Sequence, residues 1–404
     1  MSGNLLVGQS GGPTSVINSS LCGVIQAAMH SQAVDRTLGM RWGIEGFLRG
    51  EIIDLDRQRP ETIEGLKRTP SSALGSCRYR LKDSDLPLVL ERLAAYDVHY
   101  LVMIGGNDTM DTIARIEKFC GNEGYELAGI GVPKTVDNDL FGTDHTPGYP
   151  SAARYVALSI QQSGRLARDM KMVDQFVIHQ TVGRDAGWLA ASAALARTEE
   201  DDPPHLIYLP ERPIRRERFL ADARACIARY GYVSIVCGEG IAWDDGTPVS
   251  ASVDRDKFSN IEFGAMGGAS AATVLHRILS SSGAAKLRGE FQITESLSMC
   301  AIDRASPIDV EEAYGAGLRS VVLAEGGATG AMVTIEREKG IAYSIRYGTA
   351  PLEEVAMRTK PMPDEFIAAD GNDVTPAFVE YLRPLVGGLE PYSSFQEIPA
   401  GESR

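Results

Sequence analysis

Short apolar runs alternate with longer helical patterns along this chain, and the alternation restricts its fold more than any other feature. Residues 16–30, 109–120 and 186–196 predict helices. Strands that alternate with helices build a parallel sheet with helices on both faces, so an α/β fold is expected. The apolar runs that predict buried strands are residues 5–7, 98–104, 127–132, 176–178, 206–208, 233–237 and 321–323.

The length of the chain fits two such units in series. Its 404 residues allow two to three domains at about 150 residues each. A junction is expected near the sequence Pro147-Gly148-Tyr149-Pro150. We therefore predict two doubly wound Rossmann-like domains with the active site in the cleft between them.

Composition excludes several classes of function. The chain has 54 acidic and 40 basic residues and a net charge of −14, which argues against a general binder of nucleic acid or anionic membranes. No apolar stretch approaches the roughly 18 residues of a membrane-spanning helix, and the N-terminus does not have the pattern of a signal peptide. The six cysteines form no C-x-x-C pair, so a reduced cytoplasmic protein without structural zinc is expected.

Three turns that follow predicted strands have an unusual chemistry. They are residues 8–14 (GQSGGPT), 105–109 (GGNDT) and 133–139 (PKTVDND). In a doubly wound sheet, ligands bind beyond the carboxyl ends of the strands. These turns are therefore candidates for a binding or catalytic site.

The first turn allows two functional interpretations besides an ordinary strand–helix turn. Gly11 and Gly12 precede a helix, where backbone N–H groups can approach an anion. Ser10 lies in a G-x-S-x-G pattern and could be a nucleophile, but none of the six histidines has a recognisable catalytic context, which disfavours a hydrolase. The chain contains neither a P-loop nor a complete G-x-G-x-x-G motif.

The other two turns carry carboxylates. Asp108 could cap a helix or hold magnesium on a phosphate. Thr135, Asp137 and Asp139 alternate along an extended loop and could project to one side. A carboxylate there could accept a proton from an attacking hydroxyl, and Lys134 could neutralise a transferring phosphoryl group. The alternative is a polar surface loop.

Several motifs, in one order, resemble the phosphofructokinase family and within it the pyrophosphate-dependent branch. The resemblance implies magnesium-dependent, reversible transfer of a phosphoryl group from pyrophosphate to the 1-hydroxyl of fructose 6-phosphate, a step of glycolysis. It also implies a homodimer or homotetramer. The resemblance runs from residue 5 to about residue 333 and rests on residues 10–18 (SGGPTSVIN), 75–79 (GSCRY), 105–109, 133–139 and 182–188 (VGRDAGW), with Glu239 and Arg304.

The resemblance implies a role for each matching residue. Asp137 would deprotonate the sugar hydroxyl, while Lys134 and Arg184 would act on the transferring phosphoryl group. Asp108 would hold the magnesium ion. The implied donor-binding residues are Gly11, Gly12, Arg78, Gly106, Asp108 and Thr109, and the implied acceptor-binding residues are Thr135, Asp139, Val182, Gly183, Arg184, Glu239 and Arg304.

Two positions distinguish the donor, and the same resemblance suggests the domain division. ATP-using relatives have glycine at the positions of Asp108 and Lys134. An aspartate there repels a nucleotide α-phosphate, and a lysine adds charge that helps pyrophosphate react, so both residues favour pyrophosphate. We expect a donor domain of residues 1–150 with about 305–360, and a sugar-phosphate domain of residues 151–304 with about 361–404.

Other positions depart from the family pattern. Asn107 replaces an aspartate that many relatives direct toward magnesium, and Val182 replaces the usual methionine. Gln175, Glu295 and Ala301 stand where relatives have charged or hydrogen-bonding groups near the acceptor phosphate. One alternative is therefore a pyrophosphate-dependent kinase of another sugar or polyol that lacks the 6-phosphate. A non-catalytic sensor of phosphate metabolites is a second alternative, and the presence of Asp137 argues against it.

Overall fold

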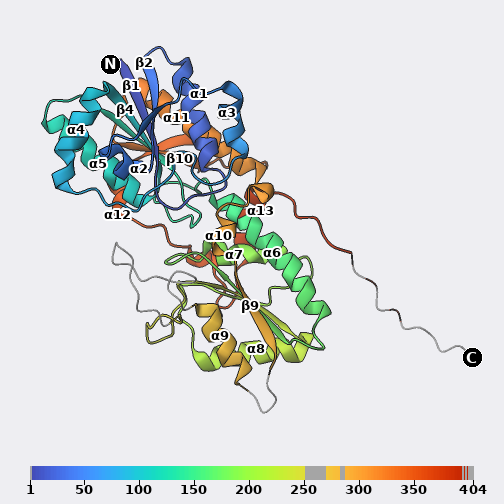
Figure 1. The fold of residues 1–404 in the computed structure, drawn as a ribbon. Coiled ribbons are helices and arrows are strands. Elements are labelled where there is room, and N and C mark those ends of the chain that lie inside the picture. Colours follow the sequence, from blue (N-terminus) through green and yellow to red (C-terminus); the bar gives the residue numbers. More distant parts are fainter. Residues whose placement is uncertain (1, 251–269, 283–286, 394, 396–397, 399–404) are drawn as a thin grey trace, which may run out of the picture.

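The structure is a computed structural model that describes residues 2–250, 270–282, 287–393, 395 and 398. It contains two α/β units, each built on its own sheet, which confirms the predicted fold class (Figure 1). The strands are β1 (Gly3–Gln9), β2 (Val34–Met40), β3 (Ile52–Asp54), β4 (Val98–Gly105), β5 (Ala128–Pro133), β6 (Phe176–Thr181), β7 (Leu206–Tyr208), β8 (Val233–Gly238), β9 (Gly289–Ile293), β10 (Ala331–Arg337) and β11 (Ile345–Pro351).

Helices connect most of these strands, and short 3₁₀ turns extend several of them. The α-helices are α1 (Ile17–His30), α2 (Gly43–Leu48), α3 (Pro60–Gly65), α4 (Leu86–Ala95), α5 (Asn107–Asn122), α6 (Tyr149–Asp169), α7 (Trp188–Ser192), α8 (Arg216–Tyr230), α9 (Ala271–Ser280), α10 (Glu295–Ser298), α11 (Pro307–Glu325), α12 (Leu352–Met357) and α13 (Pro376–Val386). The 3₁₀ turns are η1 (Leu66–Arg68), η2 (Asp83–Asp85), η3 (Ala193–Ala196), η4 (Ile302–Arg304) and η5 (Asp364–Phe366).

The first sheet has seven strands in the order β11-β10-β5-β4-β1-β2-β3. Its inner strands are parallel, but β3 pairs antiparallel with β2, and β11 pairs antiparallel with β10. The prediction of a wholly parallel sheet is therefore wrong at both edges. Each antiparallel edge strand follows its partner in sequence, and the connection from β10 to β11 is too short for a parallel crossover.

Helices cover both faces of this sheet (Figure 1). α1 and α11 pack together on one face, and α4, α5 and α12 lie on the other. Close approach of α1 and α11 depends on two glycines. A Cβ added at Gly23 would lie 2.1 Å from the Tyr314 carbonyl oxygen, and one added at Gly317 would lie 2.1 Å from the Ser20 carbonyl oxygen.

The second sheet has four parallel strands in the order β7-β8-β6-β9. α8 and α9 cover one face, and α6, α7 and α13 pack on the other. The chain enters this unit through α6, whose first turn is bound by a residue of α11. The buried Asp309 carboxylate accepts N–H bonds from Gly148 and Ser151 at the start of α6.

Two of the predicted elements differ from the observed ones. Residues 321–323 are not a strand but part of the last turns of α11, which starts at the Ser306 cap and Pro307. Val321 is buried while Val322 is half exposed, which is typical of one helix face on a sheet. Residues 186–196 form α7 followed by η3 rather than one helix. Among the described residues, no helix combines the length and apolar character that a membrane crossing requires.

Candidate active site

The carboxyl ends of β1, β4 and β5 bring the three unusual turns together. These strands are neighbours in the seven-stranded sheet. The Ser10 N–H donates to the Ile104 carbonyl over 2.9 Å, and the Lys134 N–H donates to the Gly105 carbonyl over 3.1 Å. Backbone hydrogen bonds therefore join the first turn to the end of β4, and the third turn to the second.

The first turn leaves open space that the Lys134 ammonium approaches. Gly11 has a φ of +75°, and a Cβ added there would lie 3.0 Å from the Lys134 Nζ. A Cβ added at Gly12 would meet nothing within 4 Å. The Ser76 hydroxyl donates to the Gly11 carbonyl over 2.7 Å, which fixes the segment that carries the exposed Arg78 beside this turn. The sequence prediction that Gly11 and Gly12 directly precede a helix is inexact, because α1 begins only at Ile17. A glycine turn with accessible backbone and two cationic side chains nearby still suits an anion.

The third turn presents its polar residues in alternation, as predicted. Thr135, Asp137 and Asp139 are partly exposed, whereas Val136 and the other intervening residues are buried. The Asp137 N–H donates to the Thr135 hydroxyl over 3.1 Å. A hydrogen bond between two residues of the loop therefore stabilises its conformation.

The pKa of Asp137 in this loop is strongly raised. Burial raises its pKa to about 8, with further increases from Asp139 and Glu239 and opposing effects of Lys134 and Arg184. Its Oδ1 is buried and has no hydrogen-bond partner among the described residues. A carboxyl group with a pKa near neutrality and an unengaged oxygen has the properties of a general base.

Lys134 has the complementary perturbation. The side chain is buried, and burial lowers its pKa to about 8, although Asp137 and Asp139 oppose the decrease. An ammonium group in such a site interacts strongly with charge that develops on a phosphoryl group.

The second unit contributes a cation and a carboxylate from the ends of β6 and β8. Arg184 lies three residues after the end of β6, and Glu239 directly follows β8. The Gly183 N–H donates to a Glu239 carboxylate oxygen over 3.3 Å. A Cβ added at Gly240 would lie 1.7 Å from the Arg184 carbonyl oxygen, so the loop after β8 packs tightly against the loop after β6.

The two units meet at these residues. Glu239 and Arg184, which follow strands of the four-stranded sheet, both act on the charge of Asp137, which follows a strand of the seven-stranded sheet. Burial raises the pKa of Glu239 to about 7, with a further increase from Glu295. The predicted residues from both units therefore form one electrostatically coupled site at their junction.

The second turn offers a position for magnesium. Gly106 precedes α5, Asp108 is exposed in its first turn, and Thr109 is buried against Gly105. No group of three His, Cys, Asp or Glu residues in the described part of the chain is arranged to hold a metal ion. Magnesium on phosphates is usually held through one or two carboxylates, so the exposed Asp108 carboxylate fits that duty.

A comparison with protein families identifies the family to which this fold belongs. A family model described as phosphofructokinase matches residues 4–289. The chain belongs to the phosphofructokinase family. This confirms the assignment made from the motifs.

Three relatives span nearly the whole chain. The pyrophosphate–fructose 6-phosphate 1-phosphotransferase of Halomonas elongata is 36% identical over 97% of this chain and 94% of that protein. A pyrophosphate-dependent phosphofructokinase from Marinobacter aquaeolei, known from its crystal structure, has a TM-score of 0.86 at 34% identity and covers 98% of this chain and 94% of that chain. The sulfofructose kinase of Alkalicoccus urumqiensis is 32% identical over 98% of both proteins.

The residues that depart from the phosphofructokinase pattern occupy two different places. Glu295 begins α10 and accepts a hydrogen bond from the buried Gln180 side chain over 2.8 Å, beside Glu239. Gln175 lies at the other end of β6 from Arg184, and its side chain binds the backbone of Val173 and Arg288. Gln175 therefore lies away from the site that Arg184 joins.

Arg304 ends η4 and lies against α6, Ala301 directly precedes η4, and Val182 is packed against the core of the second unit. The Arg304 guanidinium carbon lies 5.5 Å from the centre of the Tyr155 ring on α6. Its Nε is 3.9 Å from an exposed Asp303 carboxylate oxygen. Arg304 is one-third exposed, so it remains accessible to a ligand.

Lys360, which the motifs did not single out, lies against Asn138 of the third turn. Asn138 adopts a φ of +54° between the two aspartates. Lys360, more than 200 positions later, donates to the Asn138 side chain over 3.2 Å. No sequence pattern relates such distant residues, so only the folded chain reveals them.

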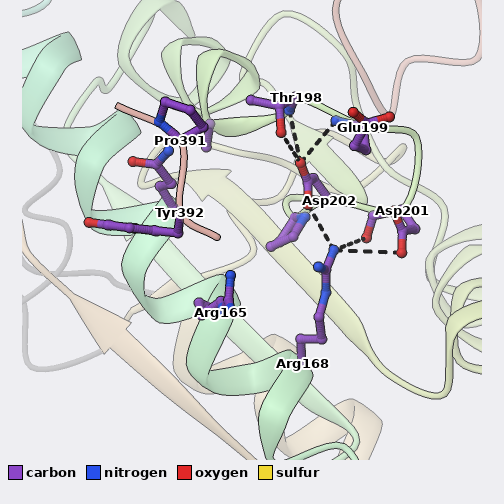
Figure 2. Close-up of a pocket in the computed structure, with 11 residues that line it drawn as sticks. Arg165, Arg168, Thr198, Glu199, Asp201, Asp202, Pro391 and Tyr392 are labelled. Atoms are coloured by element: carbon purple, nitrogen blue, oxygen red, sulfur yellow. Dashed lines mark hydrogen bonds and ion pairs between the residues drawn. The ribbon is translucent and has the colours of Figure 1, made fainter. Parts of the chain in front are cut away.

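A separate cavity of about 550 Å³ lies on the second unit, beside the C-terminal part of α6 (Figure 2). Arg165 and Arg168 line it together with Tyr392 of the C-terminal segment. Arg168 pairs with Asp202 at 2.7 Å and Asp201 at 3.6 Å, so its charge is already balanced. None of the predicted site residues lines this cavity.

Proposed function

We propose that the protein transfers a phosphoryl group from pyrophosphate to the 1-hydroxyl of fructose 6-phosphate. The products are fructose 1,6-bisphosphate and phosphate, and we infer that the reaction is a reversible step of glycolysis. Similar proteins are named pyrophosphate–fructose 6-phosphate 1-phosphotransferase. One observation carries the proposal. Asp137, a carboxylate with an unengaged buried oxygen, lies within electrostatic reach of Lys134 on one side and Arg184 on the other.

Each charged residue has a defined part in this reaction. Asp137 accepts the proton of the sugar hydroxyl as its oxygen bonds to phosphorus. The bridging P–O bond of pyrophosphate then breaks, and Lys134 stabilises the negative charge on the departing phosphate. Arg184 contacts the equatorial oxygens of the transferring group. Thr135 and Asp139 orient the reacting groups, and Glu239 accepts a hydrogen bond from a sugar hydroxyl.

The donor pocket comprises the first two turns. Gly11, Gly12 and Gly106 allow pyrophosphate to approach the backbone, and Arg78 and Thr109 complete the pocket. Asp108 would hold magnesium, which supplies positive charge to the phosphates. Val182 and Gly183 shape the acceptor side, and Arg304 binds the acceptor phosphate.

The same proposal assigns the two units. Residues 1–150 with about 305–360 form the donor domain, and residues 151–304 with about 361–404 form the acceptor domain. We also expect a homodimer or homotetramer, and the exposed Met172 (88%) and Val173 (45%), three and two residues before Gln175, are compatible with a contact there. Monomers rarely expose apolar groups together without a partner.

A second acceptor is favoured by one feature of the site. The Glu295 carboxylate stands beside Glu239, where it disfavours a doubly charged phosphate more than a singly charged or neutral group. A relative named sulfofructose kinase is similar over the full length of this chain. The second candidate is therefore a pyrophosphate-dependent kinase of a sugar that carries a 6-sulfonate, or no charge, instead of the 6-phosphate.

An acceptor screen with magnesium and two donors tests both candidates. Purified protein is assayed with pyrophosphate or ATP against fructose 6-phosphate, 6-deoxy-6-sulfofructose and fructose, and phosphorylated products are separated by anion exchange. We expect pyrophosphate to give the higher kcat/KM. An equal or higher kcat/KM for ATP would contradict the donor assignment. Asp108→Gly should relax the exclusion of ATP, and Lys134→Gly should weaken the use of pyrophosphate.

A further inference from the structure

The segment Arg358–Met362 crosses from the first unit to the second directly beside the active site. We call these five residues the crossing strap. The Arg358 carbonyl accepts a hydrogen bond from the Asn107 side chain of the second turn over 3.1 Å. Thr359 forms a β-bridge with Leu140, and the Lys360 N–H donates to the Asp139 carbonyl over 2.8 Å. The strap is thus bonded to two of the three turns that build the site.

The strap also reaches the loop of the second unit that carries Arg184. The Met362 N–H donates to a Glu211 carboxylate oxygen over 3.2 Å. The same carboxylate accepts the Gly187 N–H over 2.9 Å, three residues after Arg184. The second turn, the third turn and the loop that carries Arg184 are therefore connected through five consecutive residues.

Lys360 is the centre of this connection. Its ammonium donates to the Asp144 carbonyl over 2.7 Å, the Thr143 carbonyl over 3.1 Å and the Asn138 side-chain oxygen over 3.2 Å. An ammonium group has three hydrogens, and each has an acceptor here. Lys360 also lies 5.2 Å from the centre of the Trp188 ring at the start of α7.

Asn138 is the residue that this ammonium holds. Its side chain is buried, and its backbone has the left-handed conformation, with a φ of +54°. Residues other than glycine rarely adopt this conformation. Its side-chain oxygen also accepts the Thr146 N–H over 3.1 Å, and its amide nitrogen lies 3.4 Å from the Tyr381 hydroxyl. The left-handed turn between Asp137 and Asp139 sets the directions of both carboxylates.

We propose that Lys360 is a positioning residue of the active site, which holds the left-handed turn at Asn138 and thereby aims Asp137 at the acceptor hydroxyl. The proposal rests on the proposed phosphoryl transfer. Lys360 touches no substrate and acts through Asn138 and the Asp139 backbone. Its low pKa agrees with this place in the fold, because burial lowers the pKa of Lys360 to about 8 while Asp144 and Asp139 oppose the decrease.

A purely structural role for Lys360 makes a different prediction. The C-terminal segment is also tied to the second unit by a paired contact between Arg197 and Asp373, with N–O distances of 2.8 and 2.5 Å. In the described part of the chain, neither Arg197 nor Asp373 forms a hydrogen bond with a residue of the third turn. Arg197→Met is therefore a matched control, since it removes a tie of the same segment without touching the catalytic loop.

Kinetics separate the two roles. We expect Lys360→Met to lower kcat by about tenfold to a hundredfold with little change in either KM, because small misplacements of a catalytic group have effects of this size. Arg197→Met should lower the melting temperature and leave kcat per folded molecule unchanged. A Lys360→Met protein that is less stable but retains the wild-type kcat would overturn the proposal.

Hydrogen exchange gives a readout that does not depend on activity. In Lys360→Met, the peptide that contains the Thr146 amide should exchange at least several-fold faster than in the wild type, and in Arg197→Met it should not. If Lys360→Met does not fold, Lys360→Arg is measured instead, because a planar guanidinium cannot donate to three acceptors around one nitrogen. Unchanged exchange and kcat in the folded variant would refute the role of Lys360. Absence of activity in the wild type would refute the proposed function alone.

Discussion

Asp137 combines two demands that oppose each other. Its carboxylate must be ionised to accept a proton, yet its surroundings favour the neutral form. Burial, Asp139 and Glu239 raise its pKa from 3.8 to about 8. The unfolded chain ionises this group at a lower pH than the folded protein does. The free energy of unfolding therefore decreases as the pH rises above about 4. The residue is therefore placed for chemistry rather than for folding.

Replacing Asp137 with asparagine should separate these two demands. The amide keeps the shape but cannot accept a proton, so we expect kcat to fall by about 10²–10⁴-fold with little change in KM. The melting temperature at pH 8 should stay the same or rise, because no carboxylate remains to be ionised at a buried position. Steady-state kinetics and thermal denaturation measure both effects. A variant that keeps most of its kcat would place the base elsewhere.

The pH dependence of the reaction should follow two opposing groups. Asp137 must lose its proton and Lys134 must keep its own, and the pKa of each lies at about 8. The kcat/KM for the acceptor should rise with pH up to about 8 and fall above it. The two limbs belong to the interacting pair rather than to either residue alone. A profile that is flat between about pH 6 and pH 9 would contradict this expectation, provided activity returns when samples are brought back to pH 8.

At the scale of elements, local pattern predicted the strands best. β1, β4, β5, β7 and β8 were found within two residues of their expected ends, because buried strands of a doubly wound sheet are continuous apolar runs. The same rule failed at residues 321–323, where an apolar run lies on a helix face. α6 was missed at the expected junction, since its start depends on Gly148 and on the Asp309 carboxylate from α11.

Packing of α1 against α11 is another property that pattern could not reveal, and it can be tested. A Cβ at Gly317 would lie 2.1 Å from the Ser20 backbone oxygen, so Gly317→Ala should destabilise the protein by about 1–3 kcal/mol. Gly121→Ala in α5 is the control. A Cβ there meets nothing within 4 Å, so this change should stabilise by up to about 1 kcal/mol. Urea denaturation compares them, and a stabilising Gly317→Ala would show that the helices can separate freely.

At the scale of the whole molecule, the site collects residues from both sheets and from the C-terminal segment. Motifs identified Lys134, Asp137 and Arg184 because each lies in a distinctive turn. Their mutual distances, the pKa of Asp137 and the contact with Lys360 arise only when two sheets and the crossing strap are assembled. The motifs therefore predict which groups take part in the reaction, whereas the interactions that shift their pKa values depend on the assembled fold.

The acceptor is the property that depends most on this assembly, and Arg304 tests it. Glu239 and Glu295 put two carboxylates near the acceptor side, while Arg304 stays one-third exposed beside Tyr155. If the acceptor carries a 6-phosphate, Arg304→Ala removes a charge-assisted hydrogen bond of about 1.5–3 kcal/mol, which is roughly a tenfold to 150-fold loss of affinity.

Isothermal titration of wild type and Arg304→Ala with fructose 6-phosphate, 6-deoxy-6-sulfofructose and fructose distinguishes the acceptors. A phosphate-specific pocket binds fructose 6-phosphate most tightly and loses that preference in the variant. A pocket adapted to a singly charged group binds the sulfonate at least as tightly as the phosphate, because the neighbouring carboxylates repel a second negative charge more. Tight binding of fructose 6-phosphate that survives Arg304→Ala would show that another cation holds the phosphate, and the acceptor pocket would then have to be sought away from η4.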